Sequence, residues 1–392
     1  MDRKAFEATS AGRVLYVPGG DYWAYVPNSL PPALTWTPSL VADLSVADRA
    51  LGELSGLGRV LPNPHLLIAP FVRREAVLSS QIEGTQASLF DLYAYEVSQL
   101  PIFERPADVR EVHNYVRALE HGLERLGSLP FSLRLIRELH ERLMTGVRGE
   151  HQTPGEFRRS QNWIGAPGCT LNDATYVPPP PVDMLETLAA LERFFHADSS
   201  LPPLIRLGLI HYQFEAIHPF LDGTGRVGRL LLTLLLCAWE LLPQPLLYLS
   251  AYFETHRQEY YASLLAVSQQ GAWERWLRFF LQGVAEQSHD AVRRAGQLQA
   301  LREQYRTRFQ SVRTAARLLQ VVDLLFARPV VGVTQVAQAL DVSFQAAARH
   351  VDTLVAEGVL REITGQARGR LYRADAILRA IEAPLQQDLH AR

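Results

Sequence analysis

Lysine is almost absent from this chain of 392 residues: Lys4 is the only one among the 39 basic residues, and the others are all arginines. Lys4 stands in no phosphate-binding motif. The chain therefore lacks the lysine of a P-loop, of a protein kinase, of a Schiff base and of a Ser–Lys dyad. If the protein handles phosphate, it must use arginine side chains and backbone amides.

Cysteines and long apolar runs are also scarce. Cys169 and Cys237 match no zinc-binding spacing and form no disulfide framework, which favours a reducing compartment. The longest apolar stretch, residues 230–239, is about half of the roughly 20 residues that span a bilayer, so it predicts a buried helix. No basic and hydrophobic leader opens the chain. We expect a cytoplasmic protein with no membrane partner.

The charge balance excludes little else. A net charge of -2 gives no global excess that would indicate nucleic acid or a membrane surface. Hydrophobic residues make up 47% of the chain, so it can bury a core and is not a disordered polymer. The length suggests two or three domains.

Periodicity divides the chain. Residues 1–40 are rich in aromatic residues and proline without clear periodicity, and predict an extended arm packed on a larger body. Helical periodicity extends from about residue 41 to 287. The one interruption, residues 157–177, predicts a strand, a Gly/Pro turn and a second strand. Asp183 is the expected N-cap of a helix over residues 184–195.

The last hundred residues have a different composition. Residues 288–317 contain two acidic residues and seven arginines, which are Arg293, Arg294, Arg302, Arg306, Arg308, Arg313 and Arg317. The pattern then predicts a helix over 315–326, one to residue 340 capped by Thr334, and one to residue 357 capped by Ser343. Two strands, 359–363 and 370–373, follow. A helix, a helix–turn–helix and a hairpin make the order of a winged helix.

The segment with the most chemistry is residues 218–229. Its three glycines, Gly223, Gly225 and Gly228, come just before the apolar run, where flexible backbone and a helix N-terminus can gather amides around an anion. Arg226 and Arg229 are three residues apart, so both lie on one face of that helix and offer planar forks to phosphate oxygens.

The same segment holds a metal ligand and a base. Asp222 supplies a hard oxygen of the kind that Mg²⁺ accepts beside phosphates, and His218 can take a proton near neutral pH. Taken singly, a histidine before a proline or a glycine-rich turn before a helix is more often structural. The joint pattern is far more specific.

This pattern resembles the signature of the Fic (Fido) family, His-x-Phe-x-Asp/Glu-Gly-Asn-Gly-Arg-x-x-Arg, with Thr224 in place of Asn. The resemblance implies a mainly α protein, in which an all-helical Fic core with a β-hairpin flap is joined to a C-terminal winged helix. We expect an N-terminal arm and inhibitory-helix region over residues 1–110, the catalytic core over 111–287, and a helical linker with the winged helix over 288–392.

The resemblance also implies the activity of a protein adenylyltransferase, which transfers AMP from MgATP to a Ser, Thr or Tyr hydroxyl of a target protein or of itself. His218 would be the general base, and Asp222 would hold Mg²⁺. The ATP-binding residues would be Gly223, Thr224, Gly225, Arg226, Val227, Gly228, Arg229, Tyr260 and Tyr261. In the family, the Asn at the position of Thr224 contacts phosphate; Thr keeps a hydroxyl but is shorter.

Two further stretches fit the family. The borders of residues 157–180 resemble the flap that aligns an extended target segment, with Ile164 and Tyr176 as target-binding residues; a plain surface hairpin is the alternative. Residues 257–264 resemble the adenosine-pocket helix, which would bring Tyr260 and Tyr261 near ribose and base. Two adjacent tyrosines on a helix can also be plain core.

A third stretch resembles a regulatory motif. Residues 79–84 fit the family's inhibitory pattern Ser/Thr-x-x-x-Glu-Gly/Asn through Ser79, Glu83 and Gly84. The resemblance implies that Glu83 pairs with Arg229 and takes the place of the γ-phosphate, because a carboxylate and a phosphate compete for one guanidinium. A solvated helix carboxylate is the simpler alternative.

Other functions stay open. The winged helix could bind DNA through a recognition helix that carries Gln345, Arg349 and His350, although winged helices also dock proteins. The chain would then be a DNA-binding regulator whose Fic core senses nucleotide. A third alternative is a bifunctional enzyme that also removes AMP, with Glu83 positioning water. A homodimer is plausible from the resemblance.

Overall fold

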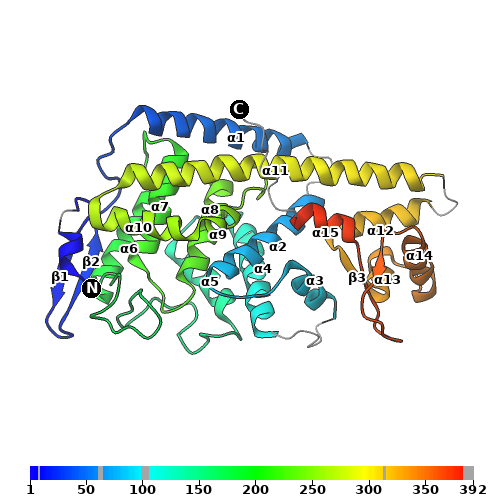
Figure 1. Ribbon diagram of the computed structural model, residues 1–392, viewed down its shortest axis with the longest axis horizontal. Helices are drawn as coiled ribbons and strands as arrows, with labels where there is room; N and C mark the ends of the chain where they lie inside the picture. Colours follow the sequence, from blue (N-terminus) through cyan, green and yellow to red (C-terminus); the bar gives the residue numbers. More distant parts are fainter. Residues whose placement is uncertain (8, 61–64, 99–105, 312–314, 383–392) are drawn as a thin grey trace.

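The computed structural model describes residues 1–7, 9–60, 65–98, 106–311 and 315–382. Within these ranges the protein is mainly helical, as predicted, and α-helices occupy most of the stretch from residue 38 to 309. Figure 1 shows α11 (Trp273–Phe309) running along much of the length of the molecule, with an N-terminal hairpin near one end and the winged helix at the other. None of the described helices is long and apolar enough to cross a membrane.

The remaining helices of the core are α1 (Pro38–Val60), α2 (His65–Ile82), α3 (Leu89–Ser98), α4 (Pro106–Leu126), α5 (Leu133–Met144), α6 (Pro181–His196), α7 (Pro203–Ile217), α8 (Thr224–Ala238), α9 (Ser250–Thr255) and α10 (Arg257–Gln270). Of these helices, α1, α7, α9 and α10 pack against α11, and the others lie farther from it (Figure 1). The helices α7 and α8 are buried on nearly all sides, so the apolar run starting at Leu230 lies in the centre of the core. The loop between these two helices carries the motif.

The N-terminal arm is a β-hairpin, which periodicity did not predict. Strand β1 (Gly12–Val17) pairs antiparallel with β2 (Tyr22–Pro27). Strand β2 is buried on both faces, so its side chains do not alternate between apolar and polar, and the strand signal is lost. The arm does pack on the larger body: Tyr25 is fully buried, and its N–H donates to Val177 O at 2.8 Å.

The start of α6 differs from the prediction. The helix begins at Pro181, with Pro180 as its N-cap residue, and Asp183 lies in the first turn instead of capping it. Proline is well suited to the first helical position because the N–H that it lacks would have no partner there. The proline run therefore starts the helix and does not delay it.

The predicted strands over residues 157–177 are present only as one antiparallel bridge between Ile164 and Tyr176. Both backbone bonds of this pair form, Ile164 N–H to Tyr176 O at 2.8 Å and the reverse at 3.0 Å. Turns occupy the residues between them, including Gly168 at φ +80°. The segment is a broad loop closed by a single pair of residues, and Cys169 within it is a free thiol, as is Cys237.

The winged helix has the predicted order. It consists of α12 (Ala315–Ala327), α13 (Val333–Leu340), α14 (Phe344–Ala356) and α15 (Asp375–Glu382), with the strands β3 (Val330–Gly332), β4 (Arg361–Glu362) and β5 (Leu371–Arg373) in the sheet order β3-β5-β4. Ser343 caps α14 by accepting from Ala346 N–H, as expected. Thr334 is no cap, because α13 begins at Val333 after Gly332.

The arginine-rich linker belongs to α11, which continues across the predicted domain boundary after residue 287. Several of its arginines are paired. Arg302 lies 2.7 Å from Asp323 of α12, and Arg308 lies 2.5 Å from Glu357 beyond α14. Arg302 and Arg308 therefore form ion pairs between the long helix and the winged helix, and they are not part of an unpaired basic surface. Arg313 lies outside the described residues.

Candidate active site

The loop between α7 and α8 holds the motif in a constrained backbone. His218 ends α7 in the left-handed conformation (φ +47°), and its N–H donates to Phe214 O at 3.1 Å. Gly223 precedes α8 at φ +79°, a conformation that glycine adopts without strain. The first intrahelical bond of α8 runs from Val227 N–H to Gly223 O, so the amides of residues 224–226 come before that ladder.

The start of α8 offers backbone amides that can bind an anion. The amides of residues 224–226 precede the hydrogen-bond ladder of α8 and lie at the positive end of its dipole, so they remain the predicted anion-binding groups. The predicted contribution of Val227 needs correction, because its side chain is fully buried and its amide is used within the helix. The donors are the amides of Thr224, Gly225 and Arg226.

Two buried side chains that the sequence did not single out hold the loop. Arg158 donates through Nε to His218 O at 2.9 Å, and its Nη2 reaches the carbonyls of Pro179 and Ile217. His140 stacks on Phe220 at a ring distance of 3.7 Å. The nitrogens of His140 bond Asp222 O at 3.0 Å and Gly155 N–H at 2.9 Å. Both residues act on backbone groups, so no spacing in the sequence reveals them.

The His218 ring is half-buried in the cavity wall. Burial lowers the pKa of His218 to about 4, and the nearby charge of Arg158 acts in the same direction. Nδ1 has no hydrogen-bond partner among the described residues. The imidazole is therefore neutral at physiological pH and able to accept a proton.

Thr224 is not turned toward the anion site. Its side chain is 2% exposed, and Oγ1 accepts from Phe220 N–H at 3.2 Å and lies 3.3 Å from Phe220 O, to which it donates. The hydroxyl thus closes the motif loop on itself. The predicted phosphate contact of the Thr224 side chain is not supported by this orientation, although its backbone amide stays at the anion site.

Arg226 is buried in an ion cluster that the sequence did not predict. Its Nη1 lies 3.0 Å from Glu111 Oε2, and its Nη2 lies 3.2 Å from Asp222 Oδ1. Glu111 lies on α4, 115 residues away in the chain. Arg226 therefore has two carboxylate partners, while Asp222 keeps a third of its side chain exposed to the loop surface.

Arg229 is bound by the region predicted to be inhibitory. Its Nε donates to Ser79 Oγ at 2.8 Å, and its Nη2 donates to Ser79 O at 2.9 Å and to Glu83 Oε1 at 2.6 Å. Burial would raise the pKa of Glu83, but the charge and the hydrogen bond of Arg229 outweigh it, so the pKa is lowered and the carboxylate stays ionised. Gly84 follows at φ +98° and turns the chain away after α2.

Glu83 also stands against the anion site. A Cβ atom at Gly225 would lie 2.5 Å from Glu83 Oε1 and 3.1 Å from Arg229 Nη1, so only glycine permits this approach. The carboxylate therefore lies where the dipole and the amides of α8 would attract an anion.

These groups open on a cavity of about 450 Å³. His218, Arg229, Glu83 and the bridge residues Ile164 and Tyr176 all line it. Ile164 is 42% exposed, whereas Tyr176 is buried and donates to Ala216 O at 2.7 Å. The bridge thus lines the same cavity as His218, and Ile164 is the side chain of the pair that an incoming segment can reach.

The two predicted adenosine tyrosines separate. Tyr261 lines the cavity and is 44% exposed. Tyr260 is buried instead, where it stacks on Phe253 at 4.5 Å and bonds His211 Nε2 at 2.8 Å. Adjacent residues on a helix point in different directions, so the predicted nucleotide contact of Tyr260 is not supported.

Another carboxyl group in the cavity wall was not predicted. Glu215 lies one helical turn before His218, and burial raises the pKa of Glu215 to about 7. Gly228 lets it approach, because a Cβ there would collide with Glu215 Oε1. The sequence could have indicated Glu215, because residues three positions apart on a helix lie on the same face, which here is the face of His218.

Three family models match the chain. The Fic/DOC family N-terminal model covers residues 41–124, the Fic/DOC family model covers 130–236, and an HTH DNA binding domain model covers 318–378. Protein adenylyltransferase Fic of Drosophila erecta is 31% identical over 131 residues, 32% of this chain and 24% of its own length. The protein of the same name from Drosophila virilis is 33% identical over 131 residues, again 32% of this chain, and 25% of its own length is matched. The chain thus spans about a quarter of the length of these relatives.

Solved structures show the same fold. A Fic family protein from Desulfovibrio desulfuricans has a TM-score of 0.57 at 20% identity, covering 88% of this chain and 98% of its own. Fic-1 from C. elegans has a TM-score of 0.51 at 22% identity, covering 65% of this chain and 73% of its own. The chain therefore carries domains of the Fic/DOC family over residues 41–124 and 130–236, followed by an HTH DNA binding domain in the winged helix.

Proposed function

We propose that the protein is an adenylyltransferase that transfers AMP from ATP to a hydroxyl group of a target protein or of itself, and that Glu83 restrains it. The observation that carries the proposal is the 2.6 Å contact between Glu83 and Arg229 at the anion site of α8. The relatives named protein adenylyltransferase support the chemistry.

The residues present fit a nucleotide with Mg²⁺. Asp222 offers one partly exposed carboxylate next to the amides of residues 224–226. Mg²⁺ often takes one or two carboxylates and completes its shell with phosphate oxygens and water, so the Asp222 carboxylate beside these amides fits it. When bound, Mg²⁺ would neutralise charge on the phosphates; Asp222 would hold it.

The chain's own groups supply the other roles. The amides at the start of α8 bind phosphate oxygens, and Arg229 binds the terminal phosphate once Glu83 has left. His218, neutral because of its burial, accepts the proton of the target hydroxyl. A bond forms from that oxygen to the α-phosphorus, the bond to the β-phosphate oxygen breaks, and pyrophosphate leaves. Arg158 keeps His218 in place through its carbonyl.

Arg226 has a role set by its partners. Glu111 and Asp222 hold its guanidinium beside the anion site. The positively charged group is therefore already in position when the phosphates bind. The Ile164–Tyr176 bridge adds one exposed apolar side chain near His218, where an extended target segment could be aligned.

The direct test is transfer of label from [α-³²P]ATP with Mg²⁺. We expect Glu83→Gly to label itself or a target strongly, wild type weakly, and Glu83→Gly/His218→Ala not at all. Glu240→Gly is the matched control, since Glu240 is an exposed glutamate just after α8 with positive φ and lies away from the cavity. No transfer by Glu83→Gly would overturn the proposal.

A second candidate rests on the HTH DNA binding domain match. On α14, Gln345 and Arg349 are exposed, and Arg368 and Arg370 are exposed between β4 and β5. We propose that this face binds duplex DNA. A gel shift of the full chain at low and high salt tests it, with Arg349→Ala as the variant. Equal affinity of wild type and variant, or no shift at low salt, would dismiss this candidate.

A further inference from the structure

A larger cleft, of about 930 Å³, lies between the core and the winged helix, away from the motif. Its walls come from α3, α4 and α5 on one side and from Arg328, Val330 and Gln335 of the winged helix on the other. The winged helix is fixed there, since Gln335 Nε2 donates to Val97 O at 2.9 Å. The volume falls in the range of small-molecule sites.

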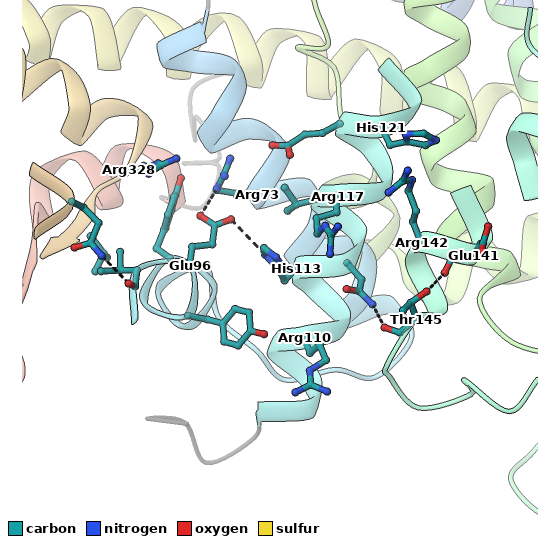
Figure 2. Close-up of a pocket in the computed structure, with 18 of the residues that line it drawn as sticks. Arg73, Glu96, Arg110, His113, Arg117, His121, Glu141, Arg142, Thr145 and Arg328 are labelled. Atoms are coloured by element: carbon teal, nitrogen blue, oxygen red, sulfur yellow. Dashed lines mark hydrogen bonds and ion pairs between the residues drawn. The ribbon is translucent and has the colours of Figure 1, made fainter. Parts of the chain in front are cut away.

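Four arginines face this cleft without an ion pair among the described residues: Arg110, Arg117, Arg142 and Arg328. Each is exposed, and Figure 2 shows Arg110 and Arg117 along one side of α4, with Arg142 on α5 across from them. Arg110 donates to the Gly146 carbonyl at 3.1 Å. What sets these four guanidinium groups together is that they line one cleft, to which they give a cationic lining.

The other charged groups of the cleft are largely satisfied. Arg73 and Glu96 pair at 2.9 Å, and His113 lies 3.8 Å from the other oxygen of Glu96 (Figure 2). Two carboxylates, Glu120 and Glu141, line the cleft without an ion pair among the described residues. The four unpaired arginines outnumber the two unpaired glutamates, so the cleft has an excess of positive charge. The two glutamate carboxylates add hydrogen-bond acceptors among the arginines.

Two tyrosines also line the cleft. Tyr93 lines the cleft and is 1% exposed, yet its hydroxyl has no hydrogen-bond partner within the described chain. Tyr95 stands near it as an aromatic wall, with its ring 5.4 Å from that of His113.

We propose that this cleft binds a small phosphorylated organic molecule of the nucleotide class. The arginines suit phosphate oxygens, the two glutamates suit hydroxyl or amino groups, and Tyr95 suits a planar ring. The glutamates would repel a continuous phosphate backbone, so a small phosphate ester fits better than nucleic acid. The site touches the winged helix and Arg73 of α2, the helix that leads to Glu83, and it does not rest on the transferase activity.

The test is isothermal titration of the full chain with ATP in excess EDTA. Arg117→Ala/Arg142→Ala removes two exposed cations, and Arg193→Ala on α6 is the matched control, because it is exposed and lies outside the cleft. We expect wild type and Arg193→Ala to share a binding event that the double variant weakens at least tenfold. Circular dichroism melting checks that all three chains are folded.

Two results would overturn the proposal. One is ATP binding that is absent, or the same in the double variant as in wild type, since any binding would then belong to the motif cavity. The other is duplex DNA binding that the double variant abolishes while ATP binding is unchanged, which would assign the arginines to nucleic acid.

Discussion

Glu83→Gln should make ATP bind more tightly, because the carboxylate and the terminal phosphate compete for Arg229. The contact is 2.6 Å long and joins two opposite charges, one of them fully buried. A hydrogen bond to a charged group contributes about 1.5–3 kcal/mol, and every 1.4 kcal/mol is about tenfold in affinity. The Gln amide oxygen can still accept from Arg229, so we expect about tenfold for Glu83→Gln and up to about 100-fold for Glu83→Gly.

The assay is titration with MgATP in a His218→Ala background, so that no turnover consumes the ligand. The variants should fold, since Ser79 still accepts two hydrogen bonds from Arg229. Glu240→Gln controls for the loss of a carboxylate elsewhere. An affinity that Glu83→Gly leaves within about twofold of the parent would refute the competition, because even a weak charged hydrogen bond exceeds that difference.

Three further predictions concern single residues. The pKa of His218 is lowered to about 4, so its imidazole is neutral above that pH and can accept a proton. The transfer rate of Glu83→Gly should therefore stay level from about pH 8 to about pH 5.5. A fall in rate centred near pH 6.5 would contradict this expectation. Thr224→Val should lower the free energy of unfolding by about 1–3 kcal/mol, because it leaves the buried Phe220 N–H unpaired, whereas Phe220 O keeps the hydrogen bond from Asn162. Urea denaturation measures the change, and a loss below about 0.5 kcal/mol would contradict this expectation. Tyr261→Ala should raise the KM for ATP, because Tyr261 lines the cavity. Tyr260→Phe should lower the stability of the fold and leave the KM unchanged, because it removes a buried hydrogen bond. The reverse pattern would show that ATP contacts Tyr260 and not Tyr261.

Short-range features of the site were predictable from the sequence. Gly223 and the apolar run after it fix a helix start with free amides, and this needs only local backbone preferences. The Ser79–Glu83 pattern identified the partner of Arg229 only through the family resemblance, since the two residues are 146 positions apart. The structure places them in contact.

Long-range partners were not predictable. Glu111 reaches Arg226 from another helix, and Arg158 bonds carbonyls, which every residue has, so neither leaves a mark in the sequence. The tyrosine pair shows a different limit. Tyr260 and Tyr261 are chemically alike, and only the packing of α10 decides which faces the core.

In the fold, too, local features were predictable from the sequence and long-range pairing was not. The helices and the winged helix follow from periodicity and caps such as Ser343. The N-terminal hairpin was missed because its inner strand is buried on both faces, and the wing strands were expected to be longer because apolar side chains extend beyond the paired residues. Pairing depends on a partner elsewhere in the chain, which a local pattern does not contain.

Label transfer from [α-³²P]ATP by Glu83→Gly, compared with wild type and with Glu83→Gly/His218→Ala, decides whether Glu83 restrains a transfer that depends on His218. We expect strong transfer by Glu83→Gly, weak transfer by wild type and none by the double variant. Equal transfer by wild type and Glu83→Gly would contradict the restraint of the enzyme by Glu83. Transfer that persists without His218 would contradict the role of His218 as the general base.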